Sequence, residues 1–297
     1  MPSDTPNILL TGADGQLGHC IQDVFAQSPG YNLINTDVNE LDITNEESVF
    51  QYFNNNNLKY CINSAAYTAV DQAEDEAKLA FLINAEACTI LAKACAEFNV
   101  KLIHVSTDYV YDSIQNASMD ETAPTSPRSI YGQSKLLGEQ NIIKQLASHY
   151  ILRTSWLYSE YGNNFVKTML KLGKSGADLK VINDQYGAPT YAMDLARLTQ
   201  TIIQSEMSGN QNHYGIYNFS NSGSTNWFEF ASEALQIAEI ETSIKPVPSS
   251  EYITKAPRPG NSRFDLNKVK TTFNTEIPDW RDSLAVCIMN MQKLDML

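Results

Sequence analysis

A tyrosine and a lysine four residues apart form the pair in this sequence best suited to acid–base chemistry. Tyr131 and Lys135 stand in the segment Tyr-Gly-Gln-Ser-Lys, and side chains at positions i and i+4 share one face of a helix. Tyrosine, with an ordinary pKa of about 10, is a poor acid or base at neutral pH, but a neighbouring ammonium group lowers that pKa by favouring the phenolate. The same spacing is common on solvated helix faces, so the pair alone leaves both interpretations open.

A hydroxyl group at the end of a predicted strand adds a second candidate. Thr107 directly follows the apolar run Leu102–Ser106. The carboxyl ends of parallel strands form the crevice in which doubly wound folds bind their ligands. A hydroxyl there can polarise a substrate carbonyl beside Tyr131, so we predict that Thr107 joins the tyrosine and the lysine in one catalytic site.

A glycine-rich turn lies upstream, between the first predicted strand and the first predicted helix. Gly12, Gly15 and Gly18 have the spacing GxxGxxG instead of the dinucleotide fingerprint GxGxxG. A turn of this kind lets backbone N–H groups approach a pyrophosphate, whose negative charge the helix dipole favours. We expect a dinucleotide at this turn, and a tight strand-to-helix turn without a ligand is the alternative.

An acidic residue stands where a dinucleotide presents its adenosine ribose. Asp37 ends the second predicted strand, nineteen residues after Gly18, and a carboxylate there hydrogen-bonds the ribose hydroxyls of NAD and repels a 2′-phosphate. Ala13 and Asp14, in the glycine turn, offer no basic group to such a phosphate. The expected cofactor is therefore NADH or NADPH, with a leaning toward NADH, while a turn or helix-capping role for Asp37 is the alternative.

The elements that must position these residues alternate regularly in the first half of the chain. Strands separated by amphipathic helices are typical of parallel βαβ units, so the pattern predicts an α/β fold with a doubly wound parallel sheet of the Rossmann type. The predicted strands are Asn7–Thr11, Asn32–Asp37, Tyr60–Asn63, Leu102–Ser106 and Tyr150–Thr154. The predicted helices are Gln16–Gln27, Glu46–Phe53, Glu74–Glu97 and Tyr131–Gln145.

The length and the less regular second half indicate two parts. A chain of 297 residues corresponds to about two domains. We expect a dinucleotide-binding domain over residues 1–155 and a smaller C-terminal α/β part, mainly substrate-binding, over residues 156–297. Segments of 156–220 are expected to return to the first domain, because no low-complexity linker separates the two parts.

The composition excludes several classes of protein. With 43% hydrophobic and 19% charged residues the chain has an ordinary globular balance. A net charge of −13 argues against nucleic acid as a partner, because phosphate contacts need clustered basic residues. The scattered cysteines and histidines show no zinc-site spacing. The N-terminus lacks a signal-peptide pattern and no apolar run is long enough for a membrane span, so we expect a cytoplasmic protein without a membrane partner or a metal.

Six longer segments make the sequence similar to a known family over nearly its whole length. They are Ala65–Asp71, Ser106–Tyr111, Tyr131–Lys135, Arg153–Trp156, Val181–Thr190 and Arg258–Ser262. Together with the glycine turn, these segments resemble the extended short-chain dehydrogenase/reductase family and, within it, the family of dTDP-4-dehydrorhamnose reductases.

The resemblance implies a reaction and a role for each catalytic candidate. It implies that the C4 ketone of dTDP-4-dehydro-β-L-rhamnose is reduced to dTDP-β-L-rhamnose by hydride transfer from NAD(P)H. Tyr131 then donates a proton to the new alkoxide. Lys135 lowers the pKa of Tyr131 and holds the cofactor ribose, and Thr107 bonds the reacting oxygen.

The resemblance also implies binding positions. Beside the glycines, Asp37 and the Tyr and Lys pair, the cofactor positions are Gln16, Leu17, Asp42, Ile43, Ala65, Ala66 and Tyr109. The positions at the sugar nucleotide are Thr68, Thr107, Asp108 and Trp156. Asn183 lies in a turn expected to cover the substrate, with a purely structural turn as the alternative. Arg258 or Arg263 is expected to clamp the substrate diphosphate, which a guanidinium fork suits, and a solvated loop charge is the alternative.

One position departs from the family pattern. Cys20 stands where some family members carry an acidic residue that helps to bind magnesium at a dimer contact. The resemblance therefore allows a homodimer but does not support a magnesium bridge.

Two other functions remain open from the sequence. One is another sugar-nucleotide enzyme of the same fold, an epimerase or a dehydratase; dehydratases generally add an Asp-Glu pair beside the strand-end hydroxyl, and no such pair follows Thr107. The other is a non-catalytic, dinucleotide-binding regulatory subunit. Net consumption of reduced cofactor distinguishes a reductase from both.

Overall fold

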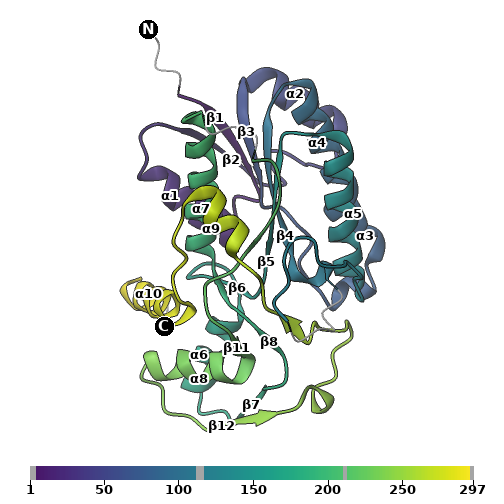
Figure 1. The fold of residues 1–297 in the computed structure, drawn as a ribbon. Coiled ribbons are helices and arrows are strands. Elements are labelled where there is room, and N and C mark those ends of the chain that lie inside the picture. Colours follow the sequence, from purple (N-terminus) through teal and green to yellow (C-terminus); the bar gives the residue numbers. More distant parts are fainter. Residues whose placement is uncertain (1–4, 112–116, 210–212, 295–297) are drawn as a thin grey trace.

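A parallel sheet of six strands forms the centre of the molecule (Figure 1). In the computed structural model, which describes residues 5–111, 117–209 and 213–294, the strands follow the order β10-β5-β4-β3-β1-β2, and all neighbouring pairs run parallel. The strands are β1 (Asn7–Thr11), β2 (Asn32–Thr36), β3 (Leu58–Asn63), β4 (Lys101–Thr107), β5 (His149–Thr154) and β10 (Gly215–Phe219). The winding reverses between β1 and β3, which confirms the predicted doubly wound α/β fold.

Helices cover both faces of this sheet (Figure 1). On one face lie α1 (Gln16–Ala26), α7 (Ala192–Met207) and α9 (Asn267–Phe273), and on the other lie α2 (Glu46–Asn56), α4 (Ala87–Glu97) and α5 (Ile130–Gln145). Side chains alternate between the faces of a strand. Ile8 and Leu10 therefore pack in the core of the first group, and Leu9 packs in the core of the second.

Two regions differ from the helices predicted by the sequence pattern. α2 continues to Asn56 instead of stopping at Phe53, and it ends where Asn57 takes the left-handed conformation, with φ +43°. Asparagine tolerates this conformation and suits a helix end, so the run of asparagines ends the helix without shortening it. α9 and α10 (Trp280–Lys293) lie beyond the predicted elements.

The long helical stretch Ala77–Glu97 contains a π turn. α3 (Ala77–Phe81) passes into the π-helical segment Leu82–Glu86 and then into α4, and a short 3-10 turn at Gln72–Glu74 precedes it. The stretch is long and apolar enough to cross a membrane by composition, but half of its apolar window is buried inside the protein. Since α4 packs against α2 and α5, the stretch is a core helix of this fold.

A smaller set of helices and strands lies at the lower end of the molecule in Figure 1. Its helices are α6 (Phe165–Lys174), α8 (Trp227–Ile237) and α10. Its short strands are β6 (Leu157–Tyr158), β7 (Leu179–Ile182), β8 (Tyr186–Gly187), β9 (Thr190–Tyr191), β11 (Thr225–Asn226), β12 (Ile244–Val247) and β13 (Asn261–Ser262). β7 pairs with β12, β8 with β11 and β13, and β6 with β9. Tyr158, Tyr191, Phe230 and Trp280 are buried in the core of this part.

Gly138 of α5 packs closely against the π turn. A Cβ at Gly138 would lie 2.0 Å from the carbonyl oxygen of Asn84, so Gly138→Ala must push the two helices apart. We expect a loss of about 2 kcal/mol in the free energy of unfolding, measured by urea denaturation. Gly30→Ala is the control, because a Cβ there meets no described atom within 4 Å. An unchanged stability of Gly138→Ala would contradict the close packing.

Candidate active site

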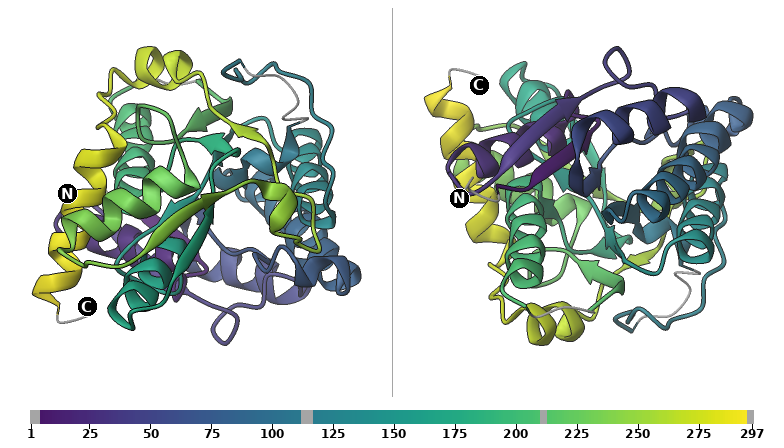
Figure 2. Two further views of the ribbon diagram at one scale, coloured as in Figure 1. Left: turned by 90° about the horizontal axis from the view of Figure 1, so that it is seen from below. Right: turned by 90° about the horizontal axis from the view of Figure 1, so that it is seen from above.

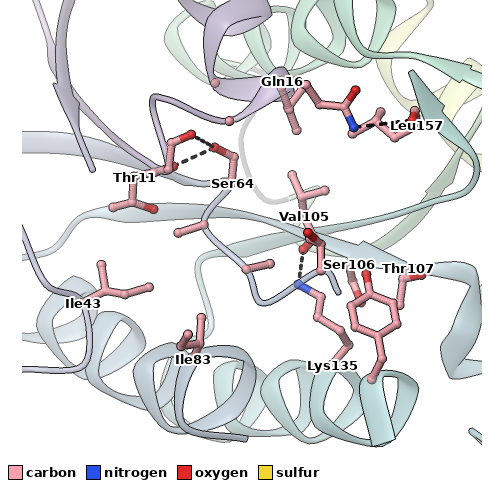
Figure 3. Close-up of a pocket in the computed structure, with 18 of the residues that line it drawn as sticks. Thr11, Gln16, Ile43, Ser64, Ile83, Val105, Ser106, Thr107, Lys135 and Leu157 are labelled. Atoms are coloured by element: carbon pink, nitrogen blue, oxygen red, sulfur yellow. Dashed lines mark hydrogen bonds between the residues drawn. The ribbon is translucent and has the colours of Figure 1, made fainter. Parts of the chain in front are cut away.

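A cavity of about 830 Å³ opens where the strands of the main sheet end. Its walls include Thr11 at the end of β1, Ser64 after β3 and Val105 in β4 (Figure 3). This is the crevice that a doubly wound sheet forms where its winding reverses. The candidate residues that line it are Gly12, Gly15, Gln16, Leu17, Gly18, Asp37, Asp42, Ile43, Ala65, Ala66, Thr68, Thr107, Asp108, Tyr109, Tyr131, Lys135 and Trp156.

The glycine turn brings two strand ends unusually close together. Gly12 has φ +71°, and a Cβ there would lie 2.6 Å from the backbone nitrogen of Ala65. A Cβ on Gly18 would lie 2.3 Å from the carbonyl oxygen of Gly12, so only glycine fits at either position. Gly15 is the N-cap residue of α1, and no side chain caps this helix end. The positive end of the helix dipole therefore faces the cavity. The turn therefore fits the pyrophosphate of a dinucleotide.

Asp37 and Asp42 line the neighbouring end of the cavity, beside Asp14 of the glycine turn. The carboxylate of Asp37 is fixed, since its Oδ2 accepts a hydrogen bond from the N–H of Asp14 at 3.0 Å and its Oδ1 accepts one from the N–H of Val38 at 2.8 Å. Asp42 Oδ1 accepts hydrogen bonds from the N–H and the hydroxyl of Thr44 at 2.9 and 2.7 Å. A fixed carboxylate with unused lone pairs can accept from ribose hydroxyls, so this end fits an adenosine.

Tyr131, Lys135 and Thr107 line the opposite end. The hydroxyl of Ser129 caps α5 by accepting a hydrogen bond from a backbone N–H three residues on, at 3.1 Å, and this fixes the turn that carries Tyr131. Tyr131 is 9% and Lys135 2% exposed. Lys135 Nζ donates to the carbonyl oxygen of Val105 at 2.6 Å (Figure 3). The structure thus brings the predicted catalytic residues together at one end of the cavity.

Burial acts on the tyrosine and the lysine in opposite directions. It raises the pKa of Tyr131, where the charge of Asp108 adds to the effect and contact with Thr107 opposes it. It lowers the pKa of Lys135. The expected lowering of the Tyr131 pKa by Lys135 is not found, because desolvation dominates and the ammonium group turns to the Val105 carbonyl. Tyr131 therefore keeps its proton at neutral pH.

A buried polar chain runs from Lys135 to the strand that precedes the glycine turn. Lys135 Nζ lies 3.5 Å from Nε2 of His104, whose Nδ1 lies 3.0 Å from Nδ2 of Asn63. The hydroxyl of Thr11 donates to Oδ1 of Asn63 at 2.8 Å. Burial lowers the pKa of His104 well below its ordinary value, so the ring stays neutral beside the ammonium group. Sequence reasoning misses this chain, because single polar residues in buried strands have no periodic signal.

A second buried network ties α5 to the ends of β4 and β5. Arg153 Nη2 lies 2.5 Å from Glu139 Oε2, and the hydroxyl of Ser106 donates to Glu139 Oε1 at 2.5 Å. Removing one partner would leave a buried charge uncompensated, so the pair fixes these elements relative to one another. Sequence reasoning also misses this pair, although the motif Arg153–Trp156 contains its arginine.

Asp108 joins Thr107 to the C-terminal part of the chain. The hydroxyl of Thr107 donates to Asp108 Oδ1 at 2.9 Å, and the hydroxyl of Ser262 on β13 donates to Asp108 Oδ2. Burial raises the pKa of Asp108 to about 6, although both hydrogen bonds oppose the shift. The two partners lie 154 residues apart, so no local pattern reveals the contact.

Trp156 and Thr68 line the cavity where a sugar nucleotide is expected. Trp156 has φ +49°, and its ring stacks on that of Trp227 with the centroids 3.8 Å apart. A Cβ on Gly187 would lie 2.9 Å from the same indole. The indole is therefore fixed by packing on two sides and presents a rigid aromatic wall.

Three predicted substrate residues do not line the cavity. They are Asn183, Arg258 and Arg263. Arg258 pairs with Asp71 and donates to the hydroxyl of Tyr109 at 3.3 Å. Arg263 donates to the side-chain oxygen of Asn261 at 2.8 Å. The backbone N–H of the half-buried Asn183 donates to the carbonyl oxygen of Val247 at 3.0 Å.

The path of segment 254–263 explains where the two arginines lie. Seen from below, the yellow-green chain after β12 crosses from the smaller part toward α3 (Figure 2). There Lys255 pairs with Asp75, and the N–H of Ala256 donates to Asp71 Oδ1 at 2.9 Å. Carboxylates of the loop after β3 thus hold the segment.

Asp108 should make the protein less stable as the pH rises. A carboxylate stabilised by an ion pair has the opposite effect, because its contribution is lost as the pH falls. The pKa of Asp108, about 6, exceeds the ordinary value of about 3.9, so the folded state binds the proton more tightly, and stability falls as the pH rises through this window. The difference corresponds to about 3 kcal/mol. Measured by urea denaturation, the stability of the wild type relative to Asp108→Asn should fall by about that amount between about pH 4 and pH 7. If the free energies of unfolding of the wild type and of Asp108→Asn changed with pH in parallel, the raised pKa of Asp108 would be contradicted.

Comparisons with known proteins agree with this geometry. Residues 6–293 match the family model described as the RmlD substrate binding domain. The chain is 38% identical over 283 residues to the dTDP-4-dehydrorhamnose reductase of Aggregatibacter actinomycetemcomitans, covering 93% of this chain and 96% of that one. Solved structures of dTDP-4-dehydrorhamnose reductases from Clostridium acetobutylicum and, in complex with NADP, from Bacillus anthracis each match with a TM-score of 0.91 and 37% identity, over 96% of this chain and 99% of theirs. The chain therefore belongs to the dTDP-4-dehydrorhamnose reductase family.

Proposed function

We propose that the protein reduces the C4 ketone of dTDP-4-dehydro-β-L-rhamnose to dTDP-β-L-rhamnose with a hydride from NADH or NADPH, the last step of dTDP-L-rhamnose biosynthesis. The observation that carries the proposal is a single cavity with the glycine turn at one end and Thr107, Tyr131 and Lys135 at the other. Membership of the family supports a keto-sugar nucleotide as the substrate. The NADP in the Bacillus anthracis relative supports a nicotinamide cofactor.

The groups of this chain orient the reactants and move one proton, while the reduced nicotinamide supplies the hydride when bound. Burial keeps the phenol of Tyr131 protonated, so Tyr131 can pass its Oη proton to the ketone oxygen as negative charge develops there. Lys135 is fixed beside it, where an ammonium group stabilises the phenolate that Tyr131 becomes and can bind the cofactor ribose.

The second hydrogen bond to the reacting oxygen is assigned to Thr107. Its hydroxyl donates to Asp108 in the structure, so it must turn from that carboxylate to the ketone oxygen. Thr68, Asp108 and Trp156 flank the same end of the cavity and are assigned to the sugar nucleotide. The diphosphate clamp by Arg258 or Arg263 stays a prediction, because both arginines hydrogen-bond within the chain.

The competing functions have less support. An epimerase or dehydratase would share Tyr131 and Lys135 but would not consume reduced cofactor, and a regulatory subunit would not need the three catalytic groups that line the cavity together. We place the reaction in the cytoplasm, with residues 1–155 and the returning segments of 156–220 as the dinucleotide-binding domain and the rest of 156–297 as the substrate part. The homodimer stays a prediction.

Tyr131→Phe removes the proton donor and keeps the aromatic ring. We expect turnover of NADH or NADPH with dTDP-4-dehydrorhamnose, followed by the near-ultraviolet absorbance of the reduced nicotinamide, to fall by about 10²- to 10⁴-fold, with dinucleotide binding retained. Tyr252→Phe makes the same change at an exposed tyrosine outside the cavity and should keep full activity. An active Tyr131→Phe enzyme would refute the proton-donor role. Absence of turnover in the wild type would refute the proposed function.

A further inference from the structure

We infer that His104 is a positioning residue for the proposed reaction. It presents a ring N–H, and no acceptor, to the amine of Lys135, so that this amine keeps N–H groups for the cavity. The inference rests on the proposed function, in which Lys135 stabilises the phenolate of Tyr131. His104 lies in β4, is completely buried and does not line the cavity, so it can act on the reaction only through Lys135.

The contacts on one side of the ring decide which nitrogen carries the proton. The hydroxyl of Thr11 donates to Oδ1 of Asn63 at 2.8 Å, so the amide turns its Nδ2 toward the ring, 3.0 Å from Nδ1 of His104. An amide nitrogen is a donor, and Nδ1 must therefore accept. Burial lowers the pKa of His104 well below its ordinary value. Because a neutral imidazole has one N–H, the proton of His104 lies on Nε2.

The thiol of Cys88 leads to the same tautomer from the other side of the ring. Burial raises the pKa of Cys88 to about 11, so the thiol keeps its proton at neutral pH and donates it to the backbone carbonyl of Asn84 at 3.2 Å. The sulfur therefore faces the ring with its lone pairs, 3.9 Å from Nε2 of His104. A sulfur in this state accepts a hydrogen bond, which fits a proton on Nε2.

With its proton on Nε2, His104 offers Lys135 no acceptor. Nζ of Lys135 lies 3.5 Å from Nε2, beyond the range of about 2.7–3.2 Å that N–H hydrogen bonds have, as expected where two donors face each other. The carbonyl oxygen of Val105 accepts one N–H at 2.6 Å, and an ammonium group has three. Among the described residues no other hydrogen bond holds this ammonium group, so two N–H groups are available to the phenolate and the cofactor ribose.

The ionisable groups around Lys135 come from β4, α4 and α5. His104 lies on β4, Cys88 on α4, and Tyr131 and Glu139 on α5. Burial lowers the pKa of Lys135, while Cys88 and Glu139 oppose the shift, and the carboxylate of Glu139 is engaged in its own ion pair. A ring N–H that faces the ammonium group acts in the same direction as burial, because it disfavours the charged form. Lys135 should therefore lose its proton at a lower pH than it would beside an acceptor.

The tautomer can be measured directly by ¹⁵N NMR of the full chain, labelled at its histidine nitrogens. The chain has four histidines, and the signals that disappear in His104→Gln belong to His104. We expect a neutral ring with its proton on Nε2 from about pH 5 to about pH 9, a range that spans the ordinary histidine pKa of about 6.5. A proton on Nδ1, or an imidazolium in this range, would overturn the inference whether or not the protein is active.

His104→Gln also tests the effect on the reaction. Its amide can turn the oxygen toward Lys135, and the ammonium group favours that orientation. Activity falls with rising pH once Lys135 is neutral, since burial holds the pKa of Tyr131 above that of the lysine. In His104→Gln this fall should move up by about one pH unit, measured as the single-turnover rate of cofactor oxidation by dTDP-4-dehydrorhamnose.

The matched control is His149→Gln. It makes the same change at another buried strand histidine, which lies outside the cavity, and it should leave the pH profile unchanged. An unshifted profile of His104→Gln would overturn the inference, and so would an equal shift in His149→Gln, because the effect would then not pass through Lys135. Absence of turnover in the wild type would refute the proposed function, and the NMR spectrum would still decide which group His104 turns to Lys135.

Discussion

The close approach of the glycine turn to the backbone after β3 determines the shape of the cavity. The turn after β1 passes so close to the end of β3 that a Cβ on Gly12 would lie 2.6 Å from the nitrogen of Ala65, and Gly18 packs against the same turn. β1 and β3 are the neighbouring strands between which the winding reverses. Their separation therefore decides how near a pyrophosphate can come to the N-terminus of α1, and the distance from there to Tyr131 is set by the order of the strands.

Burial and charge act differently at the two ends of this cavity. At the catalytic end the ionisable groups are buried, so desolvation controls the pKa values of Tyr131, Lys135 and Asp108. At the adenosine end the carboxylates of Asp14, Asp37 and Asp42 are partly or fully exposed and stay solvated. A protein with a net charge of −13 can hold an anionic dinucleotide because backbone N–H groups and a helix dipole, which add no net charge, offset the pyrophosphate.

The sequence predicts well those features that depend on local periodicity or on strand ends. The bounds of β1, Asn7–Thr11, are predicted in full, and Thr107 and Asp37 reach the cavity because the carboxyl ends of parallel strands meet at one edge. The π turn inside Ala77–Glu97 packs against α5, a contact between distant segments that no local pattern predicts. Arg258 is predicted at the substrate but pairs with Asp71, 187 residues away, because the path of a long loop follows contacts that only the folded chain creates.

The contact between Asp108 and Ser262 also orders events during synthesis. Ser262 leaves the ribosome 154 residues after its partner, which at about 5–20 residues per second is about 8–30 seconds later. The early strands can pair during that interval, but a carboxylate without its hydrogen-bond partner resists burial. We therefore expect Asp108 to become fully buried only after the segment that carries Ser262 has docked. A chain truncated before Ser262 can hold all six strands of the main sheet without a finished catalytic pocket.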